Sequence, residues 1–164
     1  MPKKLVNYAA KRDLSKTPEP PAKVRRSGKA LMFTIQKHNA SHLHYDFRLE
    51  HAGVLLSWAV PKGPSYDPGV KRLAVHVEDH PVSYGKFEGA IPEGNYGAGT
   101  VLVWDFGTWV PLENVDDMLK KGVLKFELKG QRMHGNWALV QMHGSKDWLL
   151  IKEHDGQEIE GDDD

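Results

Sequence analysis

Cysteine is absent from this 164-residue chain. Its absence excludes disulfide bridges, zinc–thiolate sites and a cysteine nucleophile. The chain also has no apolar run of ~20 residues, the length that a membrane-spanning helix needs. Its N-terminal residues contain no apolar stretch like that of a secretory signal. Because a disulfide-free chain is compatible with a reducing compartment, we expect a cytoplasmic protein without a membrane segment.

Net charge is zero as well, but the charged residues are segregated along the chain. Residues 1–30 hold nine lysines and arginines against two acids, Asp13 and Glu19. Residues 153–164 hold seven acids and neither lysine nor arginine. A basic arm of this kind is typical of loose electrostatic attraction to nucleic acid, and the alternative is a solvated tail without a partner. The acidic end is expected to be disordered.

The residue pattern divides the chain into three parts. Residues 1–30 are expected to form a basic, proline-containing, extended N-terminal arm, residues 31–152 a folded domain, and residues 153–164 the acidic tail. Within the domain, short alternating runs separated by glycine and proline predict strands joined by turns. These runs are 32–38, 43–50, 53–61, 72–79, 100–110, 123–130, 136–142 and 148–154.

One short helix is predicted at residues 114–121, where Asn114 can cap the first turn and Gly122 can end the last. Many short antiparallel strands with closely spaced turns favour a closed or strongly curved sheet. We therefore predict a mainly β fold, a compact antiparallel β-barrel of about eight strands with one short helix and the basic arm.

The candidate chemistry begins in the run LHYDFRLE at residues 43–50. Because side chains alternate along a strand, His44, Asp46 and Arg48 share one face. If residues 32–38 and 43–50 form a hairpin, His38 approaches His44 and Asp46. Two imidazoles and a carboxylate suit Mn²⁺, Zn²⁺ or Fe²⁺ with positions left open for substrate. Arg48 could then hold an anionic oxygen beside the metal.

A second polar run, RLAVHVEDHP at residues 72–81, predicts a strand that presents Arg72, His76, Glu78 and His80 on one side. Arg72 and His80 could clamp a phosphate or donate a proton to a leaving oxygen. His76 is more typical of a satisfied histidine within a sheet.

Two turn-like segments contain weaker candidates for functional residues. Lys62 lies in the sequence VPKGP and is by default an exposed turn lysine. The glycine-rich residues 91–100, IPEGNYGAGT, lack the Gly-Lys-Ser/Thr of a phosphate-binding loop. They are therefore interpreted as a tight turn into the next strand.

Three stretches together carry a resemblance to a known family: FTIQKHNASHLHYDFRLE, then SWAVPKGPS, then KRLAVHVEDHPVSYGKFEGAIPEGNYGAGTV. They closely resemble the 3′-phosphoesterase module of bacterial ATP-dependent DNA ligase D and its stand-alone relatives. The similarity runs from about Asp13 to Lys152. It implies a compact β-barrel that trims 3′ ends during the repair of DNA breaks by non-homologous end joining.

The resemblance also implies a specific activity. Members of this family are Mn²⁺-dependent nucleases that remove a 3′-terminal ribonucleoside by phosphodiester cleavage and then the remaining 3′-phosphate, which leaves a 3′-hydroxyl for ligation. Other divalent ions such as Zn²⁺ or Co²⁺ are possible cofactors. The implied partners are DNA or RNA/DNA 3′ ends in a primer–template, ligase and polymerase modules, and the Ku end-binding protein. The implied location is the nucleoid.

Site residues are carried over by position. His38, His44 and Asp46 match the metal ligands of the family, and Arg48 and His80 match its phosphate-contacting residues. Four more match other residues tied to activity, namely Lys62, Arg72, Glu78 and Tyr84. Asp13 and Glu19 are similar to acidic positions in the N-terminal arm of the family. Ser41 and His42 depart from it, because relatives often have basic side chains there.

Two other functions fit parts of the pattern. A cupin-like metal oxygenase would use His42 and His44 with Glu50 and Gly53, which loosely imitate a cupin metal motif, but it leaves Arg48 unexplained. A non-catalytic module that binds DNA ends would keep the basic arm but would not need the metal ligands. Separate alanine substitutions at His38 and His42 distinguish the two metal sites.

Overall fold

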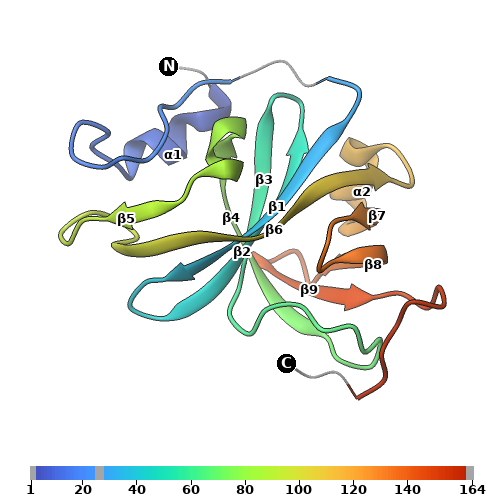
Figure 1. Cartoon of the computed structure of the whole chain (residues 1–164). Helices are drawn as coiled ribbons and strands as arrows, with labels where there is room; N and C mark the ends of the chain where they lie inside the picture. Colours follow the sequence, from blue (N-terminus) through green and yellow to red (C-terminus); the bar gives the residue numbers. More distant parts are fainter. Residues whose placement is uncertain (1–2, 25–27, 162–164) are drawn as a thin grey trace.

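The computed structural model describes residues 3–24 and 28–161, and its centre is a closed antiparallel β-barrel (Figure 1). Eight strands pair around the ring in the order β1–β2–β3–β4–β9–β8–β7–β6, and β6 pairs back with β1. A short ninth strand, β5, is added to β6 outside the ring. The predicted mainly β barrel of about eight strands is confirmed.

The strands lie close to their predicted positions. Their bounds are β1 Leu31–Asn39, β2 Leu43–His51, β3 Val54–Val60, β4 Arg72–Pro81, β5 Gly89–Ile91, β6 Gly99–Pro111, β7 Val123–Lys129, β8 His134–Gln141 and β9 Asp147–Lys152. Only β5 was not anticipated. It has three residues, too few to show a period-2 pattern.

Alternate residues of the strands fill the barrel with apolar side chains. Phe47 lies between Trp58 and Phe126, with ring centroids 6.4 and 5.9 Å away. All three side chains are fully buried, and Trp137 and Leu139 of β8 belong to the same core. Burial of this apolar area is the main driving force for closing the ring.

The helix that the sequence predicted is α2, Val115–Lys121, and the described residues contain three further helical segments outside the barrel. Asn114 Oδ1 accepts a hydrogen bond from the backbone N–H of Asp117, and Gly122 ends α2 with a φ of 76°. The unpredicted segments are η1 Lys3–Leu5, α1 Val6–Ala10 and η2 Val82–Lys86. Each has five residues or fewer, so none carries a helical hydrophobic period.

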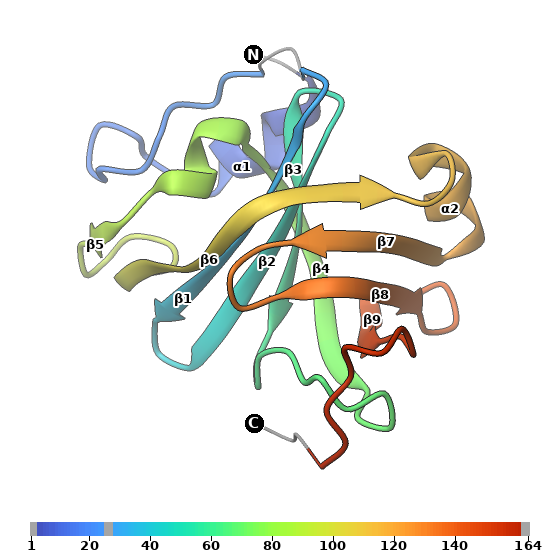
Figure 2. The same ribbon diagram turned by 45° about the vertical axis from the view of Figure 1, so that its right-hand side comes forward.

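The N-terminal arm differs from the extended leader that its composition predicts. Its described residues, 3–24 and 28–30, run along one side of the barrel, where α1 lies beside η2 (Figures 1 and 2). Leu5 and Tyr8 are fully buried against Val54, Leu55 and Tyr84. Two apolar side chains are enough to fix this short helix, although the segment is polar overall. Residues 1–2 and 25–27 of the predicted arm lie outside the described residues.

The described part of the acidic tail, residues 153–161, also contacts the barrel. Lys152 is fully buried at the end of β9, and its Nζ donates to Asp155 Oδ1 at 2.7 Å. Further along, the Ile159 N–H donates to the carbonyl of Tyr66 at 2.9 Å. The described part of the tail therefore bonds to the barrel, and residues 162–164 of the predicted tail lie outside the described residues. Within residues 3–24 and 28–161, no helix is both long and apolar enough to cross a membrane.

A buried carboxylate fixes the turn between β7 and β8. Asp105 of β6 accepts hydrogen bonds from the backbone N–H groups of Gln131, Arg132 and Met133 at 3.0, 3.1 and 2.7 Å. The carboxylate thereby accepts from three backbone N–H groups of a turn that has no strand partner for them. This turn holds β7 and β8 in register.

Replacing Asp105 with Ala is expected to destabilise the fold by about 2–4 kcal/mol, because three backbone N–H groups lose a charged acceptor. Urea unfolding followed by tryptophan fluorescence measures the change. The matched control is Asp116→Ala, whose side chain is 71% exposed and pairs with His51 on the surface. That exposed pair contributes no more than about 1 kcal/mol. Equal losses in the two variants would contradict the role given to Asp105.

Candidate active site

The register of the β1–β2 hairpin brings the predicted metal ligands together. His38 lies directly opposite His44, Gln36 opposite Asp46 and Thr34 opposite Arg48. Opposite residues of an antiparallel pair project from the same face, so all of these side chains lie on the face that points away from the barrel core. The predicted hairpin geometry is confirmed.

His38, His44 and Asp46 form one compact group of candidate metal ligands, named the metal cluster or ligand cluster below. The Oδ2 atom of Asp46 lies 3.4 Å from His38 Nδ1 and 3.3 Å from His44 Nε2. The candidate ligand atoms of all three residues lie within 4.8 Å of one another. This is the only such group of histidine, aspartate or glutamate side chains in the described part of the chain.

Backbone carbonyls fix the orientation of both imidazole rings. His38 Nε2 lies 2.6 Å from the carbonyl oxygen of Gly97, and His44 Nδ1 lies 3.0 Å from that of His42. A carbonyl can only accept, so each of these nitrogens carries a proton and donates it. The other nitrogen of each ring then faces Asp46. Metal-binding histidines are commonly oriented by such a second hydrogen bond.

The charges of the cluster are strongly coupled. Burial raises the pKa of Asp46, but the positive charge of Arg48 and the adjacent imidazoles of His38 and His44 outweigh it and hold the pKa far below its ordinary value. Burial lowers the pKa of His44, but the hydrogen bond and charge of Asp46 raise it further, so the net shift is upward. Asp46 is therefore an anion, and His44 must lose its extra proton before Nε2 can bind a cation.

This donor set fits a divalent transition-metal ion. Two imidazole nitrogens and one carboxylate oxygen suit Mn²⁺, Zn²⁺, Fe²⁺ or Co²⁺, and three protein ligands leave coordination positions open. Asp46 supplies the negative charge, and the two carbonyl-held imidazoles supply preset directions. The residues present therefore fit the metal that the sequence pattern predicted.

Arg48 is a rigid neighbour of this cluster. Its Nε donates to Gln36 Oε1 at 2.7 Å and one Nη donates to Ser57 Oγ at 2.9 Å, while the other Nη lies 3.6 Å from Asp46 Oδ2. The ring centroid of Tyr84 lies 4.9 Å from the guanidinium carbon. Only one edge of the guanidinium is left to face the metal cluster, which suits the binding of an anionic oxygen.

An irregularity in β4 moves two more predicted residues to the site. Ser57 of β3 lies opposite Val77, and Leu55 lies opposite His80. The two pairs are two residues apart along β3 but three residues apart along β4. The extra residue is a β-bulge, and it turns Glu78 and His80 toward the pocket. The regular alternation predicted for residues 72–80 is therefore wrong.

The residues before the bulge face the barrel core instead. His76 lies opposite Trp58 and stacks on it with ring centroids 4.9 Å apart, as expected for a satisfied sheet histidine. Arg72 lies opposite Leu150, a core residue of β9, and is buried there. It does not line the pocket that contains the metal cluster. The predicted clamp of Arg72 with His80 is thus not assembled.

His80 is fully enclosed. Its Nδ1 donates to the carbonyl of Glu78 at 2.9 Å, and its Nε2 lies 3.4 Å from an Nη atom of Arg12. Burial, followed by the positive charges of Arg48 and Arg12, lowers the pKa of His80 well below its ordinary value. His80 is therefore neutral at pH 7, and its Nε2 is a proton acceptor.

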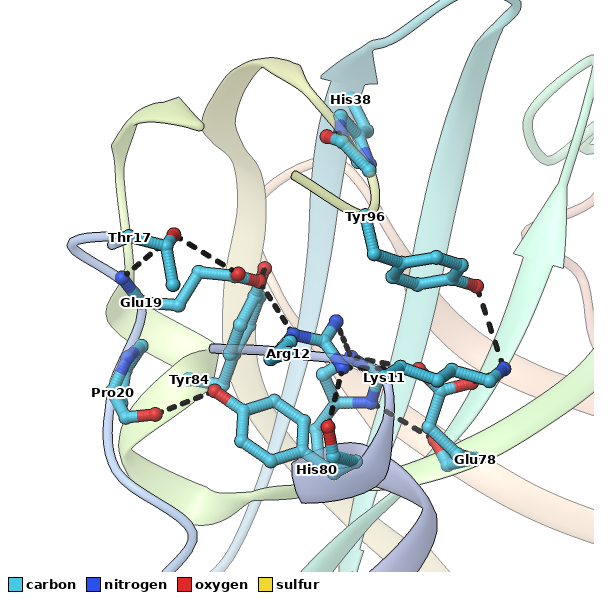
Figure 3. Close-up of polar contacts among 12 residues, drawn as sticks. Lys11, Arg12, Thr17, Glu19, Pro20, His38, Glu78, His80, Tyr84 and Tyr96 are labelled. Carbon is cyan, nitrogen blue, oxygen red and sulfur yellow. Dashed lines mark hydrogen bonds and ion pairs between the residues drawn. The ribbon is translucent and has the colours of Figure 1, made fainter. Parts of the chain in front are cut away.

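The N-terminal arm supplies residues that sequence reasoning largely missed (Figure 3). Arg12 donates from Nε to Glu19 Oε2 at 2.9 Å and from an Nη to Glu78 Oε2 at 3.3 Å. Tyr84 donates its hydroxyl to the same Glu19 oxygen at 2.5 Å. In the sequence, only the family resemblance points to Glu19, and Arg12 stands out only as one residue of a basic arm. No local pattern in the sequence shows that this arm folds back over β4.

The cluster, Arg48 and these arm residues line one pocket of about 340 Å³. It unites seven predicted site residues: His38, His44, Asp46, Arg48, Glu78, His80 and Tyr84. Lys62 and Arg72 are not in its lining, and Lys62 is exposed in the turn after β3. Asp13 is also outside the lining and bonds to Ser15 instead.

The alternative cupin-like ligand set is not assembled. The side chain of His42 is exposed in the β1–β2 turn, and it is not part of the ligand cluster. Glu50 is buried and accepts a hydrogen bond from the backbone N–H of Met32 at 2.9 Å. His38, not His42, is the histidine that approaches His44.

Comparison with known proteins agrees with this geometry. Residues 36–141 match the family model described as the DNA ligase D 3′-phosphoesterase domain. This range contains the whole metal cluster together with Arg48, Glu78, His80 and Tyr84.

Similar full-length proteins are much longer than this chain. The multifunctional non-homologous end joining protein LigD of Pseudomonas aeruginosa is 52% identical over 160 residues, which cover 94% of this chain and 19% of that protein. The multifunctional non-homologous end joining DNA repair protein LigD of Mycobacterium tuberculosis is 48% identical over 147 residues, which cover 89% and 19%. The LigD protein of Mycolicibacterium smegmatis is 45% identical over 161 residues, which cover 93% and 21%. The chain spans about a fifth of each of these relatives.

Replacing His44 with Ala is expected to weaken the binding of Mn²⁺ by more than about 100-fold, because one of three ligands is lost. Titration calorimetry with Mn²⁺ measures the affinity, and circular dichroism checks that the fold persists. His42→Ala is the matched control, because this histidine lies two residues away with its side chain in solvent. Unchanged Mn²⁺ affinity in His44→Ala, or an equal loss in His42→Ala, would overturn the ligand set.

The low pKa of His80 predicts a pH dependence of folding. Below an ordinary imidazole pKa of ~6.5 the unfolded chain takes up a proton at His80 that the folded chain does not, so stability falls with falling pH by up to about 1.4 kcal/mol per pH unit. His80→Gln is expected to remove this contribution between about pH 6.5 and 5. Urea unfolding of both proteins in the presence of EDTA tests it, and identical slopes against pH would refute it.

Proposed function

Because this chain belongs to the DNA ligase D 3′-phosphoesterase domain family, we propose that it hydrolyses phosphate esters at the 3′ ends of nucleic acid during non-homologous end joining. The proposed reactions are removal of a 3′-terminal ribonucleoside by phosphodiester cleavage and removal of the remaining 3′-phosphate. The product is a 3′-hydroxyl that a ligase can use.

One observation carries this proposal, namely the position of Arg48 beside the metal cluster. A cation-binding group and the guanidinium of Arg48 share one pocket, and the Nη atom that faces the ligand cluster lies 3.6 Å from Asp46 Oδ2. A phosphate presents several anionic oxygens at once, so it can contact both groups. Gln36 and Ser57 hold the guanidinium in place before substrate arrives. Little conformational entropy is therefore lost when the guanidinium binds a phosphate.

His38, His44 and Asp46 would hold the metal, which we propose to be Mn²⁺, with Zn²⁺ or Co²⁺ as alternatives. When bound, a divalent ion supplies Lewis-acid stabilisation of phosphate oxygens and lowers the pKa of a bound water. Asp46 is the carboxylate of the pocket that lies within the ligand cluster, whereas Glu19 and Glu78 are paired with Arg12, and Glu78 also with Lys11 Nζ at 2.8 Å.

The protein's own groups then have distinct roles in the proposed reaction. Arg48 neutralises a non-bridging oxygen, and Tyr84 supports the guanidinium through its ring. His80 lies on β4 at the pocket, and its neutral ring presents an unprotonated Nε2. This nitrogen can act as a proton acceptor, and it can act as a donor only after it has been protonated. Glu78 and Glu19 hold Arg12 next to His80. We give Lys62 and Arg72 no part in the chemistry, because neither lines the pocket.

The remaining features concern context. Lysines and arginines of the arm would add sequence-independent attraction to the nucleic acid backbone, which weakens as salt rises. Primer–template 3′ ends are the proposed substrate, and ligase and polymerase modules and the Ku end-binding protein are the proposed partners. The proposed location is the cytoplasm, at the nucleoid.

A 5′-labelled primer–template with one 3′-terminal ribonucleotide tests the function directly. Incubation of the wild-type chain with Mn²⁺ is expected to shorten the primer first to a 3′-phosphate and then to a 3′-hydroxyl, and EDTA is expected to stop both steps. Parallel reactions with Zn²⁺ and Co²⁺ establish the metal preference. Binding of the primer–template without product under any of these metals would instead favour a non-catalytic end-binding module.

Arg48→Lys sharpens this experiment. A lysine keeps the positive charge but cannot bond to Gln36 and Ser57 together and still face the metal cluster. The turnover number is expected to fall by about 10²–10³-fold while Mn²⁺ affinity is retained. Arg132→Lys is the control, because Arg132 lies against Trp104 and outside the pocket. Turnover of Arg48→Lys at the wild-type rate would show that Arg48 does not stabilise the reacting phosphate.

A further inference from the structure

The glycine-rich loop at residues 92–98, between β5 and β6, lies at the rim of the pocket, and the proposed chemistry uses only one of its atoms. That atom is the carbonyl oxygen of Gly97, which accepts from His38 Nε2. Gly97 has a φ of +75°, and a Cβ added there would lie 3.3 Å from His38 Cε1. The loop backbone therefore passes close to the metal cluster.

The residue before this glycine, Tyr96, lines the pocket with its side chain 49% exposed. Figure 3 shows its ring over the pocket, between His38 and the arm residues Lys11 and Arg12. The ring centroid lies 5.0 Å from Lys11 Nζ and 5.3 Å from the guanidinium carbon of Arg12. The tyrosine hydroxyl accepts from Lys11 Nζ at 3.5 Å. Two cations thus hold the ring at the mouth of the pocket.

Folding does not require an aromatic side chain at this position. Tyr96 belongs to neither apolar core, and the loop is built from backbone turns such as Asn95 N–H to Pro92 O at 3.2 Å and Ala98 N–H to Asn95 O at 3.1 Å. Tyr84, the other tyrosine of the pocket lining, is buried. Among the described residues that line the pocket, Tyr96 is therefore the aromatic side chain with a surface open to a ligand.

We propose that Tyr96 is a substrate-binding residue that stacks on a nucleoside attached to the phosphate in the pocket. This inference rests on the proposed function. A phosphate at Arg48 and the metal cluster places its ester substituents at the mouth of the same pocket, where the Tyr96 ring lies. Aromatic rings stack on nucleobases with little regard to sequence. Lys11 and Arg12, which flank the ring, are themselves held in place by ion pairs with Glu78.

The nucleoside could be the leaving 3′-terminal ribonucleoside or the last nucleoside of the retained strand, and two substrates distinguish them. One is a primer with a 3′-terminal ribonucleotide, and the other is the same primer ending in a 3′-phosphate, which has no leaving nucleoside. Tyr96→Ala is expected to raise KM by about tenfold or more with little change in kcat. A rise for the first substrate alone places the ring on the leaving nucleoside, and a rise for both places it on the retained strand.

Three further variants separate stacking from other roles. Tyr96→Phe keeps the ring but removes the contact with Lys11, so its KM is expected to stay within about twofold of wild type. Tyr96→Leu keeps apolar bulk without a ring face and is expected to resemble Tyr96→Ala. Phe106→Ala, an exposed aromatic of β6 outside the pocket, is the control and is expected to leave KM unchanged.

Failure of this inference differs from failure of the proposed function. Wild-type KM values in both Tyr96→Ala and Tyr96→Leu, with an active wild-type enzyme, would overturn the stacking role. A loss of kcat alone, or a KM in Tyr96→Phe as high as in Tyr96→Ala, would also overturn it, because the ring face would then not be the binding group. If the wild-type chain processes neither substrate, the proposed function itself fails.

Discussion

The buried carboxylate of Asp46 is the charge around which the site is organised. An ionised group away from water is stable only if other groups compensate for its lost hydration. Here His38, His44 and Arg48 all lie within 3.6 Å of its Oδ2 atom. The same three partners are the groups that can bind a metal and a phosphate. The arrangement that makes burial of Asp46 possible therefore also sets the geometry of the candidate active site.

The two faces of strands β1–β4 have different roles, one in the stability of the fold and the other in the candidate active site. On strands β1–β4, one face supplies the aromatic core of the barrel, and the opposite face carries the polar pocket. That polar face is covered by the arm, η2 and the β5–β6 loop, and the side chains of Asp46, Arg48 and His80 are buried there. Electrostatic interactions are stronger in such surroundings than in solvent. This explains how a small barrel can hold several charged groups at fixed distances.

Segments outside the barrel complete the pocket. The arm supplies Arg12 and Glu19, η2 supplies Tyr84, and the β5–β6 loop supplies Gly97 and Tyr96. These segments contact one another through hydrogen bonds, a ring contact and cation–π contacts rather than through strand pairing. They line the pocket from outside the barrel, whereas the candidate metal ligands come from one hairpin. Rigid ligands on strands and recognition groups on connecting segments are a common division of labour in enzymes.

The sequence by itself determined the local features of this protein. Alternation in residues 32–38 and 43–50 predicted that His38, His44, Asp46 and Arg48 converge if the two strands form a hairpin, because the strand backbone enforces period 2. Asn114 and Gly122 determined the ends of α2 in the same local way.

Only the tertiary structure decided which other residues join the site. The bulge in β4 separates Arg72 from His80, although both fit one alternating pattern, since the extra residue is defined by pairing with β3 and leaves no mark in the run itself. Arg12 and Glu19 enter because the arm folds over β4 and η2, and Tyr96 enters because the β5–β6 loop lies against Lys11 of the arm. Such contacts join residues more than 60 positions apart, and no local period records them.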